Sequence, residues 1–255
     1  MKKIIVVLIF IGFAFGVYYF QNDAGYETFS YRDDFNSFND DFWYAATWDS
    51  DLFDIKQVDV NRGIINLTIE EEDAGPYLVS KPILLEPGAT LRIKRRVQLK
   101  PTGQAFAGAL ALLETEDKGI IPSVLNKDGS RMGNGVVLVE YVTQVPEGAL
   151  RPGSNTFRVI PRTWHFQNAF EIKPSVFGKW FSNNYALVSP KYNQWIEEEL
   201  IYETKTGLIT YVLDGVSYQV KGPIIKSDRV RLYMHGYGFG TGHQIQMDWI
   251  DIRVD

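Results

Sequence analysis

Residues Thr90–Leu99 read Thr-Leu-Arg-Ile-Lys-Arg-Arg-Val-Gln-Leu, and this stretch decides the fold class. Side chains of a β-strand point alternately to its two faces, so apolar residues at every second position predict a strand with one wet face. One side of the predicted strand carries Leu91, Ile93, Arg95 and Val97, and the other carries Arg92, Lys94, Arg96 and Gln98.

Similar β-rich runs recur along the chain, separated by short turn signals that contain Gly, Pro or Asn. The sequence has no convincing helix longer than two turns and no internal repeat. This organisation predicts an all-β protein with one jelly-roll or sandwich domain over residues 21–255. The clearest other runs are Gly63–Glu70, Ala105–Leu113, Gly135–Thr143, Gln194–Glu203, Leu208–Asp214, Arg229–His235 and Gln244–Val254.

The composition is that of an ordinary globular protein, with 45% hydrophobic and 22% charged residues among 255. The absence of cysteine excludes disulfides, thiolate metal sites and a cysteine nucleophile. Because the chain has three histidines, a three-histidine zinc site would have to use all of them. The net charge of −5 argues against a nucleic-acid partner, since such binders usually show a basic patch.

The first twenty residues carry a membrane signal. Lys2-Lys3 precede an uninterrupted apolar run, Ile4–Phe20, and a basic head before an apolar segment is typical of a secretory signal. Ala14 and Gly16 supply the small residues that a signal peptidase prefers. The run is also long enough for the shortest membrane-spanning helices, so an uncleaved anchor is the alternative. We therefore expect residues 1–20 to form a hydrophobic helix that is a signal peptide or a membrane anchor. The rest of the chain is then secreted or membrane-anchored outside the cytoplasm.

Several segments, taken in order, resemble the concanavalin A-like jelly rolls, most closely the family-16 glycoside hydrolases of laminarinase and lichenase type. The similarity covers nearly all of residues 28–255 and implies a concanavalin A-like jelly-roll β-sandwich. Laminin-G and keto-disaccharide-hydrolase-like sandwiches share much of this pattern and remain alternatives. The segments that carry the resemblance are Asp33–Asn36 with Phe42-Trp43, Asn61–Leu67, Trp195–Gly215 and Met247–Ile252.

The catalytic strand of the resembled family carries Glu-x-Asp-x-Glu, and alternation places these three carboxylates on one face. The outer two serve as nucleophile and acid/base, and the retaining mechanism needs them roughly 5 Å apart. The matching stretch here is Asn134–Tyr141, which implies Val136 at the nucleophile, Leu138 at the middle acid and Glu140 at the acid/base. Valine cannot form a glycosyl ester, so the resemblance implies a domain without this mechanism. A one-residue slip in the alignment would turn Glu140 to the other face.

The candidate binding residues are polar or aromatic and lie where the resemblance implies a cleft. Alanines at 107, 109 and 111 stand where the family usually has sugar-stacking tryptophans. Tyr233, His235 and Tyr237 would share one face if their strand continued, but the glycines that follow His235 predict a loop or bulge instead. The predicted ligand-binding residues are Glu140, Tyr141, Trp164, His165, Tyr233, His235 and Tyr237.

The resemblance also implies a structural calcium ion, with Asp248 as a ligand and backbone oxygens near Gly63. Calcium takes six to eight oxygen ligands, and backbone carbonyls are suitable donors. The alternative is that Asp248 pairs with a basic residue. No other cofactor is expected.

Three functions follow from these observations. The first is an extracytoplasmic domain that binds a polysaccharide or glycan without cleaving it, through Glu140 and its neighbours. The second is a glycosidase or polysaccharide lyase that uses other residues, such as Tyr141, Arg158, His165 and His235. The third is a cell-surface structural or interaction protein. A membrane contact through residues 4–20 fits the first and third functions equally.

Overall fold

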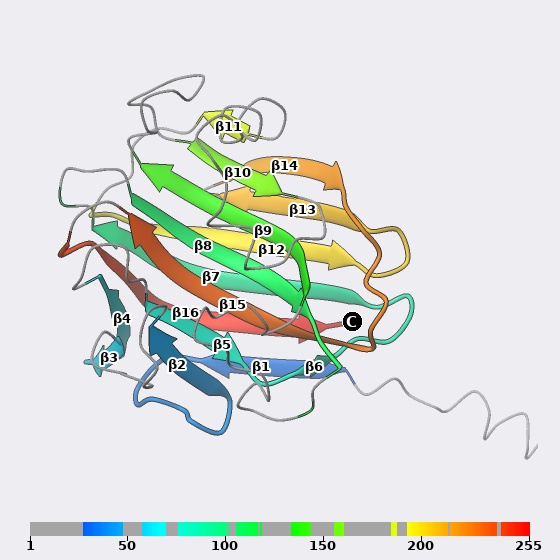
Figure 1. Cartoon of the computed structure of the whole chain (residues 1–255), viewed down its shortest axis with the longest axis horizontal. Helices are drawn as coiled ribbons and strands as arrows, with labels where there is room; N and C mark the ends of the chain where they lie inside the picture. Colours follow the sequence, from blue (N-terminus) through cyan, green and yellow to red (C-terminus); the bar gives the residue numbers. More distant parts are fainter. Residues whose placement is uncertain are drawn as a thin grey trace, which may run out of the picture.

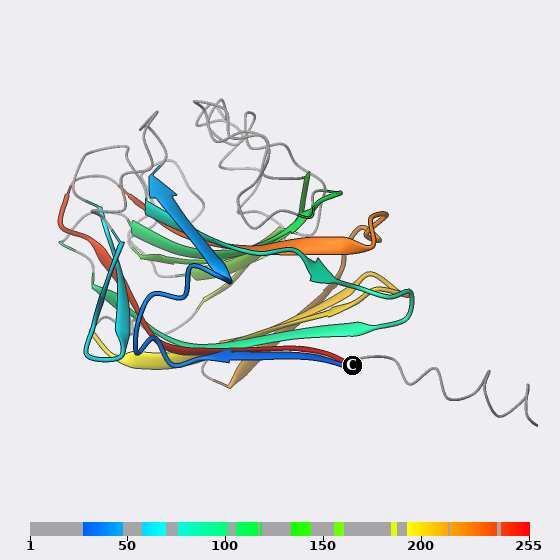
Figure 2. The same ribbon diagram turned by 90° about the horizontal axis from the view of Figure 1, so that it is seen from below.

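The computed structural model shows two antiparallel β-sheets packed face to face, which confirms the predicted jelly-roll sandwich. Figure 2 shows the sheets as separate layers. Within the described part, no helix is long and apolar enough to cross a membrane. The predicted signal or anchor lies outside it. The described residues are 28–47, 58–69, 76–100, 102, 106–116, 118, 134–143, 156–160, 185–187, 193–213, 215–238 and 241–255.

Eight strands form the first sheet, called sheet A, and β7 and β16 lie at its centre (Figure 1). β1 (Phe29–Asp33) pairs with β16 outside the main path. The order of the other strands is β14 (Val216–Lys221), β13 (Leu208–Leu213), β12 (Trp195–Glu203), β7 (Thr90–Lys100), β16 (Gln244–Val254), β4 (Ile64–Thr68) and β3 (Val58–Asn61).

The second sheet, called sheet B, also has eight strands and carries the stretch that resembles the catalytic strand. β6 (Ile83–Leu84) pairs with β15 outside the main path. The order of the other strands is β11 (Tyr185–Leu187), β10 (Thr156–Ile160), β9 (Asn134–Thr143), β8 (Phe106–Glu114), β15 (Arg229–Gly238), β5 (Pro76–Ser80) and β2 (Trp43–Thr47).

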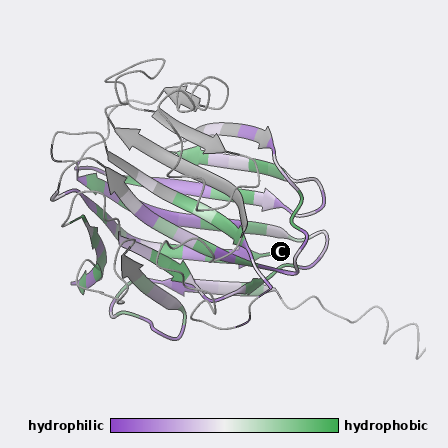
Figure 3. Ribbon diagram, in the orientation of Figure 1, coloured by the Kyte–Doolittle hydropathy of each residue, from purple (hydrophilic) through white to green (hydrophobic). Residues whose placement is uncertain are grey.

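The core lies between the two sheets and is built by the alternation that the sequence predicts. On β7, Leu91, Ile93 and Val97 are at most 1% exposed, whereas Arg92 and Lys94 point to solvent. Figure 3 shows the same alternation of apolar and polar residues along the strands of sheet A. Because every second residue of each strand enters this layer, the spacing of apolar residues fixes which face of each sheet is outward.

One charged group enters this apolar layer from each of two neighbouring strands. Arg95 of β7 and Glu198 of β12 occupy inward positions opposite each other. The Nη2 atom of Arg95 lies 2.7 Å from Oε1 of Glu198, and the Tyr211 hydroxyl donates to Oε2 at 2.6 Å. Burying either charge alone would be costly, so the pair and its hydrogen bonds make the interior position tolerable.

The turn between β3 and β4 follows from its sequence. Asn61 pairs with Ile64, which leaves Arg62 and Gly63 as a two-residue hairpin loop. Both loop residues have positive φ, 54° and 75°. Two positive φ angles match the twist of the flanking strands, and glycine adopts such a φ without steric cost.

The prediction of a loop directly after His235 is wrong. β15 continues to Gly238, and Gly236, Tyr237 and Gly238 pair with Gly108, Ala107 and Phe106 of β8. The ladder of backbone hydrogen bonds to β8 keeps this glycine-containing segment extended, because pairing stabilises a strand that its composition alone would weaken.

Candidate functional site

The outer face of sheet B, turned away from sheet A, carries two of the predicted site residues, Tyr233 and His235. Val230, Leu232 and Met234 of β15 belong to the core between the sheets. Alternation therefore places Arg231, Tyr233 and His235 on the opposite face of the same strand.

A row of directly paired residues crosses this face. His235 pairs with Tyr77 of β5 on one side and with Ala109 of β8 on the other. Ala109 pairs with Glu140 of β9, and Glu140 pairs with Arg158 of β10. Directly paired residues share a face of an antiparallel sheet, so the register assigns position 140 to the same face as His235.

The register around Glu140 contains a bulge. Leu112 pairs with Val137 and Leu113 with Gly135, so Val136 is the extra residue on β9. Val136, the position that matches the family's nucleophile, therefore interrupts the ladder. The bulge lies before Glu140, and the pairing is regular from Val137 onward.

The described aromatic residues of this face form a contiguous cluster. The ring centroids of Tyr77 and Tyr233 lie 5.5 Å apart, and those of Tyr233 and His235 lie 5.0 Å apart. These three residues are 4%, 0% and 5% exposed. The cluster is thus an interior part of the domain rather than an open surface.

Burial sets the protonation states of this cluster. Desolvation, with a smaller contribution from the positive charge of Arg95, lowers the pKa of His235 to about 3. Burial raises the pKa of Tyr77 to about 12, and burial together with the nearby Tyr77 raises the pKa of Tyr44. At neutral pH all three groups are therefore uncharged.

The face also holds a buried cation that the sequence analysis did not single out. Arg231 is fully buried, and its Nη1 atom donates to the Ser80 backbone oxygen at 3.1 Å. The Ser80 hydroxyl accepts from the backbone N–H of Leu232 at 2.9 Å, which ties β5 to β15. The spacing along the strand could have identified Arg231, because it lies two residues before Tyr233 and therefore on the same face.

The alanines of β8 have a structural explanation. Ala111 pairs with Tyr233, Ala109 with His235, and position 107 with Tyr237. At the Ala111–Tyr233 pair, where both residues are fully buried, a small residue of β8 thus accompanies a large residue of β15. Adjacent large and small side chains on neighbouring strands are a common way to fill a sheet face.

One predicted residue, Tyr141, pairs outside the Glu140 row. Tyr141 pairs with Gly108, one step along the strand from the Glu140–Ala109 pair. A Cβ atom on Gly108 would lie 2.8 Å from the Leu99 Cδ2 atom, so Gly108 faces sheet A. Trp164 and His165 lie outside the described residues.

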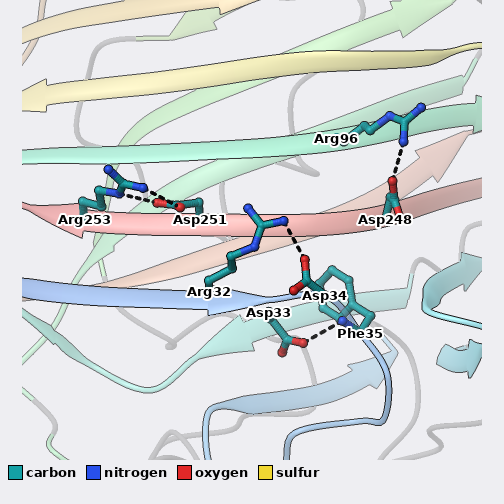
Figure 4. Close-up of polar contacts among 8 residues, drawn as sticks. All are labelled: Arg32, Asp33, Asp34, Phe35, Arg96, Asp248, Asp251 and Arg253. Carbon is teal, nitrogen blue, oxygen red and sulfur yellow. Dashed lines mark hydrogen bonds and ion pairs between the residues drawn. The ribbon is translucent and has the colours of Figure 1, made fainter.

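Asp248, which was predicted at a calcium site, lies on β16 of sheet A (Figure 4), and Gly63 lies in the turn between β3 and β4. A Cβ atom on Gly63 would be 3.6 Å from the Asp34 backbone oxygen and 3.9 Å from Oδ1 of Asn36. Asp248, however, is 2.6 Å from Nη1 of Arg96, which is the ion-pair alternative. In the part of the chain that is described, no three His, Cys, Asp or Glu side chains gather around one point. The ion pair and a calcium ion are alternative uses of Asp248, and the calcium dependence of the melting temperature distinguishes them.

Comparison with known proteins identifies the fold of this chain through solved structures. A scan against protein-family models finds no match, and a search of curated proteins finds none. The solved structures include many similar chains, and the chain has the concanavalin A-like fold that they share.

Three of these structures are a lectin, a carbohydrate recognition domain and a glucanase. Peanut lectin with a 9mer peptide has a TM-score of 0.58 at 14% identity, over 90% of this chain and 98% of the lectin. The carbohydrate recognition domain of Emp46p in its potassium-bound form gives 0.60 at 12%, over 86% and 94%. The endo-1,3-β-glucanase of Streptomyces sioyaensis gives 0.55 at 13%, over 90% and 97%. Identities this low show the fold and do not choose between binding and hydrolysis.

Proposed function

We propose that the domain binds a polysaccharide or glycan, without cleaving it, at the outer face of sheet B. The observation that carries the proposal is the row from Tyr77 through His235 to Glu140 and Arg158, on a fold shared with lectins and glucanases. The row ends at a glutamate position and an arginine position. Carboxylate and guanidinium groups form the hydrogen bonds that sugar hydroxyls require.

The chemistry of the row supports binding over hydrolysis. A retaining glycosidase needs two carboxyl groups about 5 Å apart, and the two positions that the family uses besides Glu140 are Val136 and Leu138. The lyase alternative needs a base, but a histidine with a pKa of about 3 is a weak base at neutral pH. Tyr77, with a pKa of about 12, keeps its proton at neutral pH and so is no stronger as a base.

The burial of the cluster indicates where the ligand would bind. Tyr233 and Ala111 are fully buried, so the centre of the face is closed to a ligand. We assign direct contact to the end of the row at Glu140 and Arg158, where β9 and β10 extend the sheet beyond the cluster.

The same burial favours a second candidate, a structural or interaction protein of the cell surface. A face whose central residues are filled in needs no ligand to explain its aromatic content. The two functions differ in one observable property, which is retention by a polysaccharide.

Affinity electrophoresis separates these functions. Residues 21–255 would be run through gels that contain β-glucan, galactan, xylan or a uronic-acid polymer, because every described strand lies in this part. Binding predicts retardation by one polymer and no release of reducing sugar from it. Unchanged mobility in all four gels would favour the structural function, and release of sugar would overturn the non-catalytic assignment.

A further inference from the structure

The end of the sandwich at which β1 begins gathers both described termini and three connections. Figure 1 shows this end on the right, where the C-terminus is marked. The β-ladders place Phe29 beside Val254, Val254 beside Leu91, and Leu91 beside Tyr202. The connections that close this end are residues 85–89 before β7, 204–207 after β12 and 222–228 before β15.

Hydrogen bonds fix these connections to one another. The Thr204 hydroxyl accepts from the Gly88 backbone N–H at 2.9 Å and lies 2.9 Å from the Ala89 oxygen. The Glu114 carboxylate accepts from the backbone N–H groups of Lys226 and Ser227. The end is therefore a structured surface rather than a set of independent loops.

Two large hydrophobic side chains project from this end. Ile224 is 55% exposed and Leu84 is 48% exposed. The Tyr202 hydroxyl donates to the Pro223 oxygen at 2.7 Å and accepts from the Ile225 N–H at 2.9 Å. Because both neighbours of Ile224 are held by one buried tyrosine, Ile224 is kept at the surface by the fold itself.

The apolar run of the sequence leads to this same end. Residue 28, which directly precedes β1, is separated from Ile4–Phe20 by the seven residues 21–27. Seven residues span at most about 25 Å even when fully extended. An anchor at residues 4–20 would hold this end of the domain close to the bilayer.

We propose that this end of the sandwich contacts a lipid bilayer, with Leu84 and Ile224 inserted into its interfacial region. The proposal depends on retention of residues 4–20 as an anchor and is independent of carbohydrate binding. It explains why two exposed aliphatic side chains lie where the chain arrives from the apolar run.

The charges at this end predict how the contact forms. The groove beside Ile224 is lined by Lys205 and Lys226 and by Glu86 and Asp228, so the two signs balance. Attraction to anionic lipids requires a basic cluster. The contact should therefore be hydrophobic, insensitive to salt, and present on phosphatidylcholine alone.

The absence of native cysteine makes the test direct. The full chain would carry one cysteine at a time, as Leu84→Cys or Ile224→Cys, labelled with an environment-sensitive fluorophore and reconstituted into phosphatidylcholine vesicles. Gln194→Cys is the matched control, because Gln194 is exposed and precedes β12 at the opposite end. Each sample would be quenched separately by iodide in water and by a nitroxide on the lipid.

The proposal predicts nitroxide quenching at positions 84 and 224, iodide quenching at 194, and the same pattern in high salt. Iodide quenching at 84 and 224 would overturn it, because both side chains would then be in water. Shielding from both quenchers would also overturn it, in favour of contact with a second copy or another protein. Release of the chain from the vesicles by alkaline carbonate would show that residues 4–20 are not a membrane anchor. This result would also overturn the proposal.

Discussion

The buried ion pair between Arg95 and Glu198 supports the sharpest prediction about how the interior is held. We consider Glu198→Gln, which keeps the shape of the side chain and removes its charge. The Arg95 guanidinium, 2% exposed at its side chain, would then lose its anionic partner while remaining charged. A guanidinium cannot lose its proton in a protein, so the cost cannot be relieved by neutralisation.

The magnitude follows from the geometry. At 2.7 Å and an effective dielectric constant near 20, the attraction is about 6 kcal/mol. Most of it only offsets the several kcal/mol needed to desolvate each ion, so the net contribution of the intact pair is small. Removing one partner exposes the desolvation cost of the other, and we expect a loss of about 3–5 kcal/mol in the free energy of unfolding.

The assay is urea unfolding of residues 21–255, followed by tryptophan fluorescence, on a double-mutant cycle. The set is Glu198→Gln, Arg95→Met and the combination Arg95→Met/Glu198→Gln, with Lys94→Met as control. Lys94 pairs with Glu197 at 2.8 Å on the solvent face, where such a pair contributes at most about 1 kcal/mol.

We expect each buried single variant to be strongly destabilised and the double variant to recover most of the loss. A loss below about 1 kcal/mol for Glu198→Gln would refute the reasoning, since exposed pairs cost no more than that. A double variant as unstable as the sum of the singles would refute it too, because independent sites add.

The remaining predictions concern pH, a turn and a metal. The folded-state pKa of His235 is about 3, below the ordinary value of 6.5, so the unfolded chain takes up a proton first and stability falls as pH drops from about 6.5 toward 3. His235→Phe should flatten this part of the dependence of unfolding free energy on pH, which amounts in full to about 5 kcal/mol at about 1.4 kcal/mol per pH unit. If urea unfolding of the variant gave the same slope against pH as the wild type, the burial of His235 would be contradicted. Gly207→Ala should destabilise by about 1–3 kcal/mol, because φ is +69° and the added Cβ would lie 2.7 Å from the Gly222 oxygen; a neutral effect would contradict this geometry. Because Asp248 pairs with Arg96, we expect calcium and chelators to leave the melting temperature unchanged, and a calcium-dependent rise abolished by Asp248→Asn would contradict the ion-pair assignment.

The faces of the strands in sheet A could be predicted because their alternation is strong. The alternation of Thr90–Leu99 predicts Arg95 on its apolar side, and both Arg95 and its partner Glu198 are buried. The sequence alone could not predict that Arg95 and Glu198 form a pair. That contact depends on the register between two strands about 100 positions apart in the chain.

The prediction failed where composition and pairing conflict. Glycines at 236 and 238 favour a loop, but nine consecutive pairs with β8 hold the whole segment as a strand. A single sequence does not show which strand will pair with this segment. The stabilisation that β8 provides could therefore not be included in the prediction.

The candidate site was predicted in part. The face of Glu140 depended on whether the matched stretch contained an extra residue, and the bulge at Val136 is a feature of the paired strands. Arg231 was missed because an arginine beside apolar residues reads as a solvent-facing position. Its complete burial depends on β5 and β15 lying together.

The central claim, that Glu140 and Arg158 belong to a carbohydrate-binding surface, is tested most directly by calorimetric titration with an oligosaccharide of the retarding polymer. Wild-type residues 21–255 would be compared with Glu140→Gln, Arg158→Gln and Gln219→Ala, the last an exposed position on sheet A. The account predicts saturable binding that falls at least tenfold, or about 1.4 kcal/mol, in both site variants and is unchanged in Gln219→Ala. Equal affinity in all four proteins would contradict it.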